Sequence, residues 1–173
     1  MKIIISILII MSLFSCSEKE PCDGVTCSEH GECKVEENQA ICKCEDKYIS
    51  SDLSCIIEFE IKDGTIVDNK TGLIWQNSYI KHKERDAAIS YCETLKMNSF
   101  EDWKLSNIKN LGDFHKRTNL NGIVPTQMFD GCLAEIATDG YVKTKKGAED
   151  HGGNPGDVFS FSGAANVRCV REK

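Results

Sequence analysis

The amino-acid sequence predicts an α+β protein in two parts, and three observations lead to this prediction. Six of the ten cysteines crowd into residues 22–55, a segment with almost no large apolar residues. Such a segment cannot bury a sizeable core, so covalent links must replace it. Residues 56–173 then combine short strand patterns with two helical patterns, and they are numerous enough for one ordinary domain. So many thiols in so little chain also indicate an oxidising compartment.

The N-terminus has the features of an export signal. Lys2 supplies a positive charge, and Ile3–Phe14 is a run of apolar or small residues. A run of about twelve residues is too short to span a bilayer as a mature helix, but it suits the apolar core of a signal peptide. Residues 1–15 are therefore predicted to be a leader that is removed.

The end of this leader, Leu13–Cys16, resembles a bacterial lipobox. The resemblance implies acylation of Cys16, with residues 16–21 as a linker to the membrane. Ser17 looks like an outer-membrane address, so we expect a lipid-anchored outer-membrane protein that faces the cell surface or the periplasm. The alternative is an ordinary secretory signal that happens to contain a cysteine. No later segment is apolar enough to span a bilayer.

The cysteines of residues 22–55 follow the spacing C-x4-C-x5-C-x8-C-x-C-x10-C. Bridges closing loops of about 12 to 16 residues would each contribute roughly 3 kcal/mol in the chain-entropy model. Spacing alone does not choose among the pairings that six cysteines permit. Zinc binding is the competing interpretation. It is disfavoured because paired C-x2-C knuckles are missing and an oxidising compartment favours disulfides.

The segment from Cys22 to Cys33 has His30-Gly31 just before its last cysteine, and Cys42-Lys43-Cys44 and Tyr48 follow it. Together these motifs resemble an EGF-like module. The resemblance implies a module over residues 22–55. The disulfides that it implies are Cys22–Cys33, Cys27–Cys42 and Cys44–Cys55. Lys47 departs from the glycine that is usual there, and the acidic calcium-binding signature before the first cysteine is missing, so no calcium is expected.

Residues 56–173 open with strand patterns. Ile56–Ile61 is predicted to be one strand, ended by Asp63-Gly64. Thr65–Val67 and Leu73–Trp75 flank the turn residues Asp68–Gly72, which predicts a β-hairpin.

Two helices and further short strands follow. Between Lys83 and Met97, the apolar residues Ala88, Cys92 and Leu95 recur at helical spacing. A shorter helix is predicted from Ser106 or Asn107, with Ile108, Leu111 and Phe114 directed inward. Strands are predicted at residues 133–137, 141–143, 158–161 and 167–170, with a loop at residues 147–156.

Four separated motifs carry a second resemblance. They are Asp68-x-x-Thr71-Gly72-Leu73-Ile74-Trp75-Gln76, Ala87-Ala88-x-x-Tyr91-Cys92, Asp102-Trp103-Lys104-Leu105-Ser106 and Val167-Arg168-Cys169-Val170-Arg171. In order and spacing they are similar to the Lcl C-terminal domain family, named after the globular end of a bacterial collagen-like adhesin. The resemblance covers about residues 62–171 and implies a C-type-lectin-like α+β domain with a Cys92–Cys169 disulfide. Lys104, Ser106 and Asn110 depart from the pattern of the family.

The motif residues also have a plain structural interpretation. Trp75 and Trp103 suit the anchoring of a small core. Asp68 and Asp102 are expected to cap turns or helix starts, and Gly72 to adopt a positive φ.

Two arginines flank Cys169 on a predicted strand. We expect Arg168 and Arg171 to project to one face and one of them to pair with an aspartate. The Cys92–Cys169 bridge would contribute about 4 to 5 kcal/mol to stability.

The sequence does not predict an enzyme. His30, His82, His115 and His151 are spread widely, and we expect His82 and His115 at solvent-facing positions beside helices. The sequence contains no G-x-S-x-G, H-E-x-x-H or glycine-rich phosphate loop. The loop Glu149–Asp157 has oxygen ligands for a hard cation, but a solvated loop is the preferred interpretation. No metal or other cofactor is expected.

Cys132 is the one cysteine left after Cys16 is acylated and eight others are paired. Phe129 and Leu133 beside it predict a buried thiol, which behaves as a small unreactive apolar group. An inter-chain disulfide and a catalytic thiol are the alternatives for this residue.

The charge balance and the domain order lead to a functional prediction. With 27 acidic against 21 basic residues, the chain has no basic stripe for nucleic acid. A lipid anchor, a rigid spacer and an exposed head predict a surface protein that binds or adheres to an extracellular protein or glycan. The alternatives are an envelope enzyme using Cys132 and a structural subunit of an envelope assembly.

Overall fold

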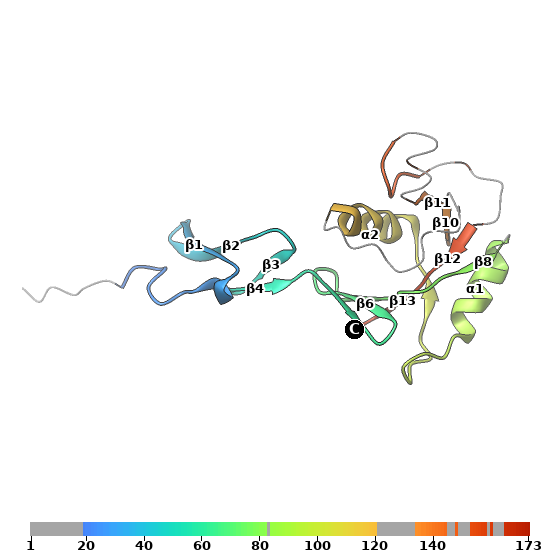
Figure 1. Ribbon diagram of the computed structural model, residues 1–173, viewed down its shortest axis with the longest axis horizontal. Coiled ribbons are helices and arrows are strands. Elements are labelled where there is room, and N and C mark those ends of the chain that lie inside the picture. The colour runs from blue at the N-terminus through green and yellow to red at the C-terminus, as the bar shows by residue number, and fades with distance from the viewer. Residues whose placement is uncertain are drawn as a thin grey trace, which may run out of the picture.

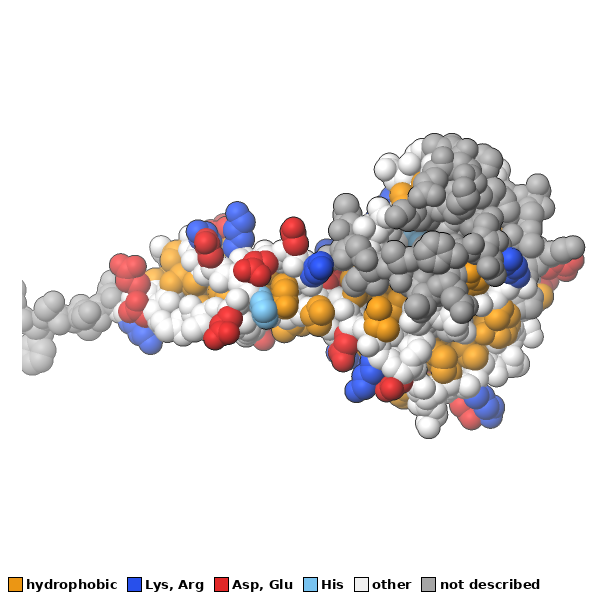
Figure 2. All heavy atoms as spheres, in the orientation of Figure 1, with side chains coloured by type: hydrophobic (Ala, Val, Ile, Leu, Met, Phe, Trp, Pro, Cys, Tyr) orange, Lys and Arg blue, Asp and Glu red, His pale blue; other side chains and the backbone are white. Residues whose placement is uncertain are grey.

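The computed structural model describes residues 19–82, 84–120, 134–144, 153–158 and 165–173, together with Ala148 and Ser160. These residues form an α+β structure, as predicted, with a narrow N-terminal module and a wider head (Figures 1 and 2). Within this part of the chain, no helix is long and apolar enough to cross a membrane.

The predicted module of residues 22–55 extends in the structure to Ile57, the end of its last strand, and residues 22–57 form two antiparallel hairpins and a short turn of 3-10 helix. The turn is η1 (Cys27–Glu29), and the hairpins pair β1 (Gly31–Glu36) with β2 (Gln39–Cys44) and β3 (Tyr48–Ser51) with β4 (Ser54–Ile57). Its small core is built largely from cystine sulfur. The disulfides are Cys22–Cys33, Cys27–Cys42 and Cys44–Cys55, which are the three pairs that the EGF-like resemblance implies.

The prediction of one strand over Ile56–Ile61 is wrong. The chain breaks at Glu58 into β4 and β5 (Phe59–Lys62), and these two strands belong to different sheets. The backbone N–H of Glu58 donates to the carbonyl of Lys47 in the module (2.8 Å), while its carbonyl accepts from the N–H of Asn69 in the head (2.9 Å). The N–H of Glu58 is thus bonded to the module and its C=O to the head, so a single strand cannot continue through this residue within one sheet.

The first sheet of the head has the order β5-β6-β7-β13-β9. The strands that follow β5 are β6 (Thr65–Asp68), β7 (Leu73–Gln76), β13 (Cys169–Glu172) and β9 (Lys104–Leu105). The predicted hairpin is confirmed as β6–β7, and Gly72 in its turn has a φ of +70°. The turn between β5 and β6 is Asp63-Gly64, where both residues have positive φ, as a two-residue hairpin requires.

The second sheet of the head has the order β11-β10-β12-β8. Its strands are β8 (Ile80–His82), β10 (Ala134–Ala137), β11 (Gly140–Lys143) and β12 (Ala165–Val167). The strand predicted at residues 167–170 is divided at Arg168 between β12 and β13. Of the strand predicted at 158–161, Val158 forms an isolated bridge with Val142, while Phe159 and Phe161 lie outside the described residues.

Two helices pack against these sheets, one helping to form each core (Figure 1). They are α1 (Arg85–Thr94) and α2 (Ile108–Leu120), close to the two predicted positions. One core joins Ala88 and Cys92 of α1 to Trp103, and the other joins Leu111 and Phe114 of α2 to sheet residues. The ring of Phe114 stacks on Trp75 at 4.4 Å between centroids. Both tryptophans are therefore buried anchors, as predicted.

A fourth disulfide, Cys92–Cys169, ties α1 to β13 and has a Cα–Cα distance of 5.4 Å. This is the pair that the second resemblance implies. Because β13 is an interior strand of the first sheet, the bridge joins the helix of one core to the sheet that both cores share.

We expect the double substitution Cys92→Ala/Cys169→Ala to lower the free energy of unfolding of the head by about 4 to 5 kcal/mol. The bridge joins residues 77 positions apart and so restricts the unfolded chain strongly. Urea unfolding followed by tryptophan fluorescence measures the change, since both tryptophans lie in the head. As a control, Cys22→Ala/Cys33→Ala removes a bridge of the module and should leave this transition in place. A loss below about 1 kcal/mol in the first variant would contradict the expectation.

Candidate functional site

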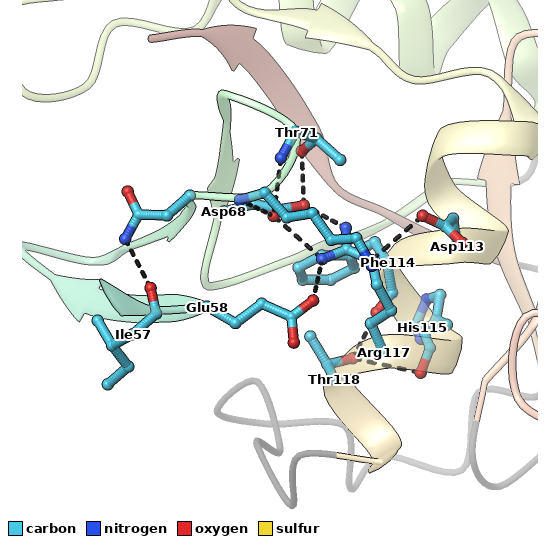
Figure 3. A network of polar contacts seen from close by, with 11 residues as sticks. Ile57, Glu58, Asp68, Thr71, Asp113, Phe114, His115, Arg117 and Thr118 are labelled. Atoms are coloured by element: carbon cyan, nitrogen blue, oxygen red, sulfur yellow. Dashed lines mark hydrogen bonds and ion pairs between the residues drawn. The ribbon is translucent and has the colours of Figure 1, made fainter. Parts of the chain in front are cut away.

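The joint between module and head is the first candidate site. Only one residue, Glu58, lies between the last strand of the module and the first strand of the head. Glu58 separates β4 from β5 and is buried, and its side chain accepts a hydrogen bond from Arg117 Nη1 of α2 at 2.7 Å. The side-chain amide of Asn69 in the head donates to the carbonyl of Ile57 in the module at 3.0 Å (Figure 3). The joint is therefore held by backbone, amide and ionic contacts at once.

Arg117 is the centre of this network (Figure 3). Its Nη1 lies 3.0 Å from Asp68 Oδ1, its Nη2 donates to Asp68 Oδ2, and its Nε donates to Asp113 Oδ2 at 3.1 Å. The guanidinium also lies over the ring of Phe59, 4.8 Å from its centroid. Burial alone would lower the pKa of Arg117, but the bonds and charges of Asp68 and Glu58 raise it further than burial lowers it. Arg117 of α2 is therefore a buried cation that contacts β5, β6 and the joint residue Glu58 at once.

Asp68 has two functions in this network. Its carboxylate accepts hydrogen bonds from the N–H groups of Lys70 and Thr71 and from the hydroxyl of Thr71, so it caps the β6–β7 turn as predicted. The same carboxylate forms the bidentate pair with Arg117, which no local sequence pattern predicts. The first motif of the head therefore fixes a turn and a helix together.

A second buried network lies around Arg168, which is 0% exposed. Its Nη1 donates to the carbonyls of Gln76 and Asn77 at 2.7 and 2.8 Å, and its Nη2 donates to Glu135 Oε1 at 3.0 Å. Arg168 thus stabilises the end of β7 and reaches Glu135 on β10 of the second sheet. One side chain connects the two sheets of the head.

His115 belongs to this second network, and the prediction of a solvent-facing position for it is wrong. The residue lies in α2 and is 1% exposed, and its Nε2 is 3.2 Å from Glu135 Oε2. The angles at Nε2 are not those of a hydrogen bond. Ile108, Leu111 and His115 share one helical stripe, so the spacing indicated burial although the residue type did not. His82 lies in β8, and its side chain is outside the described part.

Glu135 carries the clearest electrostatic signal of the head. Burial would raise its pKa, but the guanidinium of Arg168, which also donates hydrogen bonds to the carboxylate, and the adjacent imidazole of His115 lower it from 4.5 to about 2. The carboxylate is therefore ionised at every pH near neutral and neutralises the buried guanidinium. Such a pair has a structural function and leaves no proton for general acid–base chemistry.

The expectation that Arg168 and Arg171 share one face is wrong. Residues three apart on a strand project to opposite faces, and Arg168 also lies at the break between β12 and β13. Arg171 instead donates to Asp102 Oδ1 at 2.8 Å and covers the ring of Phe100, 3.8 Å from its centroid. The expected arginine–aspartate pair is thus confirmed as Arg171–Asp102. The side-chain bond of Arg171 is the main reason that the pKa of Asp102 is lowered.

A cavity of about 470 Å³ runs along the exposed side of α2. Its lining includes Lys109, Asn110 and Lys116 of the helix and Val158 of the facing segment. A Cβ on Gly112 would lie 2.7 Å from the carbonyl oxygen of Gly156, so only glycine permits this close approach of segment and helix. The described lining offers two lysine ammonium groups, the carboxylate of Asp113 and the amide of Asn110 for polar contacts, and it contains no serine, threonine or cysteine beside a base.

Several predicted site residues lie outside the described residues. They are Cys16, Cys132, Glu149, Asp150 and His151. Of the predicted cation loop, the structure describes Asn154, whose N–H donates to Asp157 Oδ2 at 2.8 Å, so this carboxylate caps a turn. Among the residues that were placed, no group of three or more histidine, cysteine or acidic side chains is arranged to hold a metal ion.

Comparison with known proteins identifies no relative. No protein-family model matches this chain, and no curated protein and no solved structure shows significant similarity to it. The two family resemblances thus remain predictions from motifs. The functional inference depends on the motifs and on the contacts described above.

We predict that Glu58→Gln loosens the joint and leaves the head folded, because it removes the charge that Arg117 binds there. Nitrogen-15 relaxation of the backbone amides measures the effect. Module and head should share one rotational correlation time in the native protein and have separate ones in the variant. Asp113→Asn is the matched control, since Asp113 binds the same arginine from an exposed position away from the joint. Unchanged joint tumbling in Glu58→Gln would contradict this prediction.

Glu135→Gln should lower the free energy of unfolding by about 3 to 5 kcal/mol, because it leaves Arg168 buried without its counter-charge. The matched control is Glu172→Gln, which breaks an exposed pair with Lys104 and should cost less than about 1 kcal/mol. Equal losses in the two variants, measured by urea unfolding, would argue against a structural function for the buried pair.

The same residue predicts a pH dependence. Since folding lowers the pKa of Glu135, its contribution is present above the ordinary value of 4.5 and is lost as the pH falls toward about 2. Native protein should therefore lose more stability than Glu135→Gln over this acid range. Urea unfolding curves recorded from neutral pH to about pH 2 test the difference. Parallel curves for the two proteins would show that Glu135 does not titrate in this way.

Proposed function

We propose that this chain is a lipid-anchored surface protein whose head binds or adheres to a ligand outside the cell. In this proposal Cys16 is acylated in the outer membrane, residues 22–55 are an EGF-like spacer, and residues 56–173 are an Lcl C-terminal-type head with a C-type-lectin-like fold. The observation that carries the proposal is the joint. A spacer fixed to a head through a buried ion pair and backbone bonds on both sides presents that head in one orientation.

The disulfides support the assignment of both parts. In the module, the first cysteine pairs with the third, the second with the fourth and the fifth with the sixth, which is the pairing expected of EGF-like modules. In the head, a cysteine of the first helix pairs with one of the last strand, as expected of a C-type-lectin-like domain. The motif residues Asp68, Trp75, Trp103 and Arg168 all have buried structural positions.

The contacts of the buried charges favour binding over catalysis. Arg117 and Arg168 are each bonded to a buried carboxylate, and the pKa of Glu135 is held far from neutral. A general acid or base needs a pKa near the working pH and access to a substrate. These networks have neither property. The proposal therefore assigns contact with other molecules to the exposed surface of the head.

The test of the proposal is the substitution Cys16→Ser in cells that carry the lipoprotein-processing enzymes. We expect the chain to move from the membrane fraction to the soluble fraction, because several acyl chains at roughly 0.8 kcal/mol per buried CH₂ are lost. Adherence of the cells to host or neighbouring surfaces should fall with it. Fractionation with mass spectrometry of the N-terminus and an adherence assay provide the measurements.

Cys132→Ser is the matched control and should change neither membrane retention nor adherence. If Cys16→Ser remains in the membrane and the native chain has no acyl mass, the anchor is wrong. If Cys132→Ser abolishes the function while the protein stays folded, the alternative of a thiol-dependent enzyme replaces the proposal.

A further inference from the structure

The strand that follows the joint lies at the edge of the first sheet. Among the described strands, β5 pairs with β6 on one side and is the terminal strand in the order β5-β6-β7-β13-β9. Glu60, Ile61 and Lys62 are all exposed, and the Ile61 side chain is 55% exposed although its strand neighbours on that face are core residues. An edge strand with an exposed apolar side chain is a template for pairing with another strand.

The register shows which backbone groups this edge offers. In an antiparallel pair, residues that bond to the partner strand alternate with residues that direct their N–H and C=O groups away from it. Lys62 and Thr65 close the two-residue turn, so Lys62 and Glu60 bond to β6, and the carbonyl of Glu58 accepts from Asn69 in the same phase. Phe59 and Ile61 therefore direct their N–H and C=O groups outward.

The sequence of this edge is complementary to itself. If two copies of β5 pair antiparallel with Ile61 opposite Ile61, their backbones exchange two hydrogen bonds and their isoleucine side chains meet on one face. On the other face Glu60 of each copy lies opposite Lys62 of the other copy, giving two pairs of opposite charge. Cross-strand pairs of both kinds stabilise a sheet by about 0.2–1 kcal/mol each.

We propose that β5 is a self-recognition edge, and that the partner of the head is the head of a second copy of this chain. The pairing is two-fold symmetric, so it closes after two copies and does not propagate into a fibre. It joins the two five-stranded sheets into one continuous sheet across the pair.

The direction of the strands adds a consequence for the proposed surface function, on which this step depends. The module enters β5 at its N-terminal end, and module and head follow one another along the long axis of the molecule (Figure 1). In an antiparallel pair the two modules therefore leave in opposite directions. Two lipid anchors at the far ends of such a pair can enter two facing membranes, and in this inference the contact joins neighbouring surfaces.

The small size of this contact suits adhesion. One short strand pair buries less surface than a stable dimer usually needs, so the isolated chains should associate weakly. Many copies on two facing membranes bind as a multivalent array, and the total strength then exceeds that of one pair by orders of magnitude. Weak single contacts also allow two surfaces to separate.

Charge exchange tests the pairing without any membrane. Glu60→Lys sets lysine opposite lysine, and Lys62→Glu sets glutamate opposite glutamate, so each variant alone should self-associate at least about tenfold more weakly than the native edge. Mixed in equal amounts, the two variants restore both opposite-charge pairs, and a heterodimer should form. Sedimentation equilibrium of the chain without its apolar leader measures association. All proteins carry Cys16→Ser and Cys132→Ser so that an inter-chain disulfide cannot contribute.

The outcomes separate this inference from the function on which it rests. Self-recognition is overturned if the protein with the native edge stays monomeric at the highest soluble concentration. It is also overturned if the mixture of Glu60→Lys and Lys62→Glu stays monomeric. Neither result affects the proposed anchor or the rigid spacer. Circular dichroism must show that both variants are folded, as their exposed positions predict.

A vesicle assay tests the opposed direction of the two modules. Nickel-lipid vesicles carrying the same chain through an N-terminal histidine tag should cluster with the native edge and with mixed variants, and not with either variant alone. Dimers in solution without clustering of vesicles would overturn the contact between two surfaces.

Discussion

The bidentate pair between Arg117 and Asp68 is the contact on which the arrangement of the other parts depends. Asp68 ends β6 and holds the β6–β7 turn, Arg117 lies in α2, and the same guanidinium binds Glu58 at the joint. A buried ion pair adds little net stability because its charges lose their hydration, but removing one partner is costly. Its effect here is geometric. It fixes where the helix, the turn and the module lie relative to one another.

Arg168 fulfils the same function in the other half of the head. It binds the carbonyls at the end of β7 and the carboxylate of Glu135 on β10, so it joins two sheets that share no hydrogen-bonded pair among the described strands. Near it, Cys92–Cys169 links α1 to β13, an interior strand of the first sheet, by a covalent bond. A small head with two modest cores thus depends on directional contacts as much as on apolar burial.

Local signals allowed the sequence to predict the two helices, the β6–β7 hairpin and the capping carboxylate of Asp68. The disulfide pairs came from resemblance, because cysteine spacing alone left many pairings open. The break at Glu58 could not be predicted, since alternation in Ile56–Ile61 does not reveal which sheet each half joins. The partners of Arg117 are equally hidden, because Glu58 and Asp68 approach it only after folding. The burial of His115 could have been predicted from its position on the apolar stripe of the helix, but its polar side chain led to the prediction of an exposed position.

The joint and the edge strand gain significance when they are considered together. β5 begins one residue after Glu58, so the network that fixes the module also fixes the direction of the exposed edge. Association costs less entropy when the binding edge is already held in its bound orientation. A weak strand pair between two membranes depends on this smaller entropy cost, because the alignment of a freely rotating head would cancel much of the small binding free energy. The rigid spacer is therefore a condition for the proposed self-recognition, and a flexible joint would argue against a strand edge as the adhesive element.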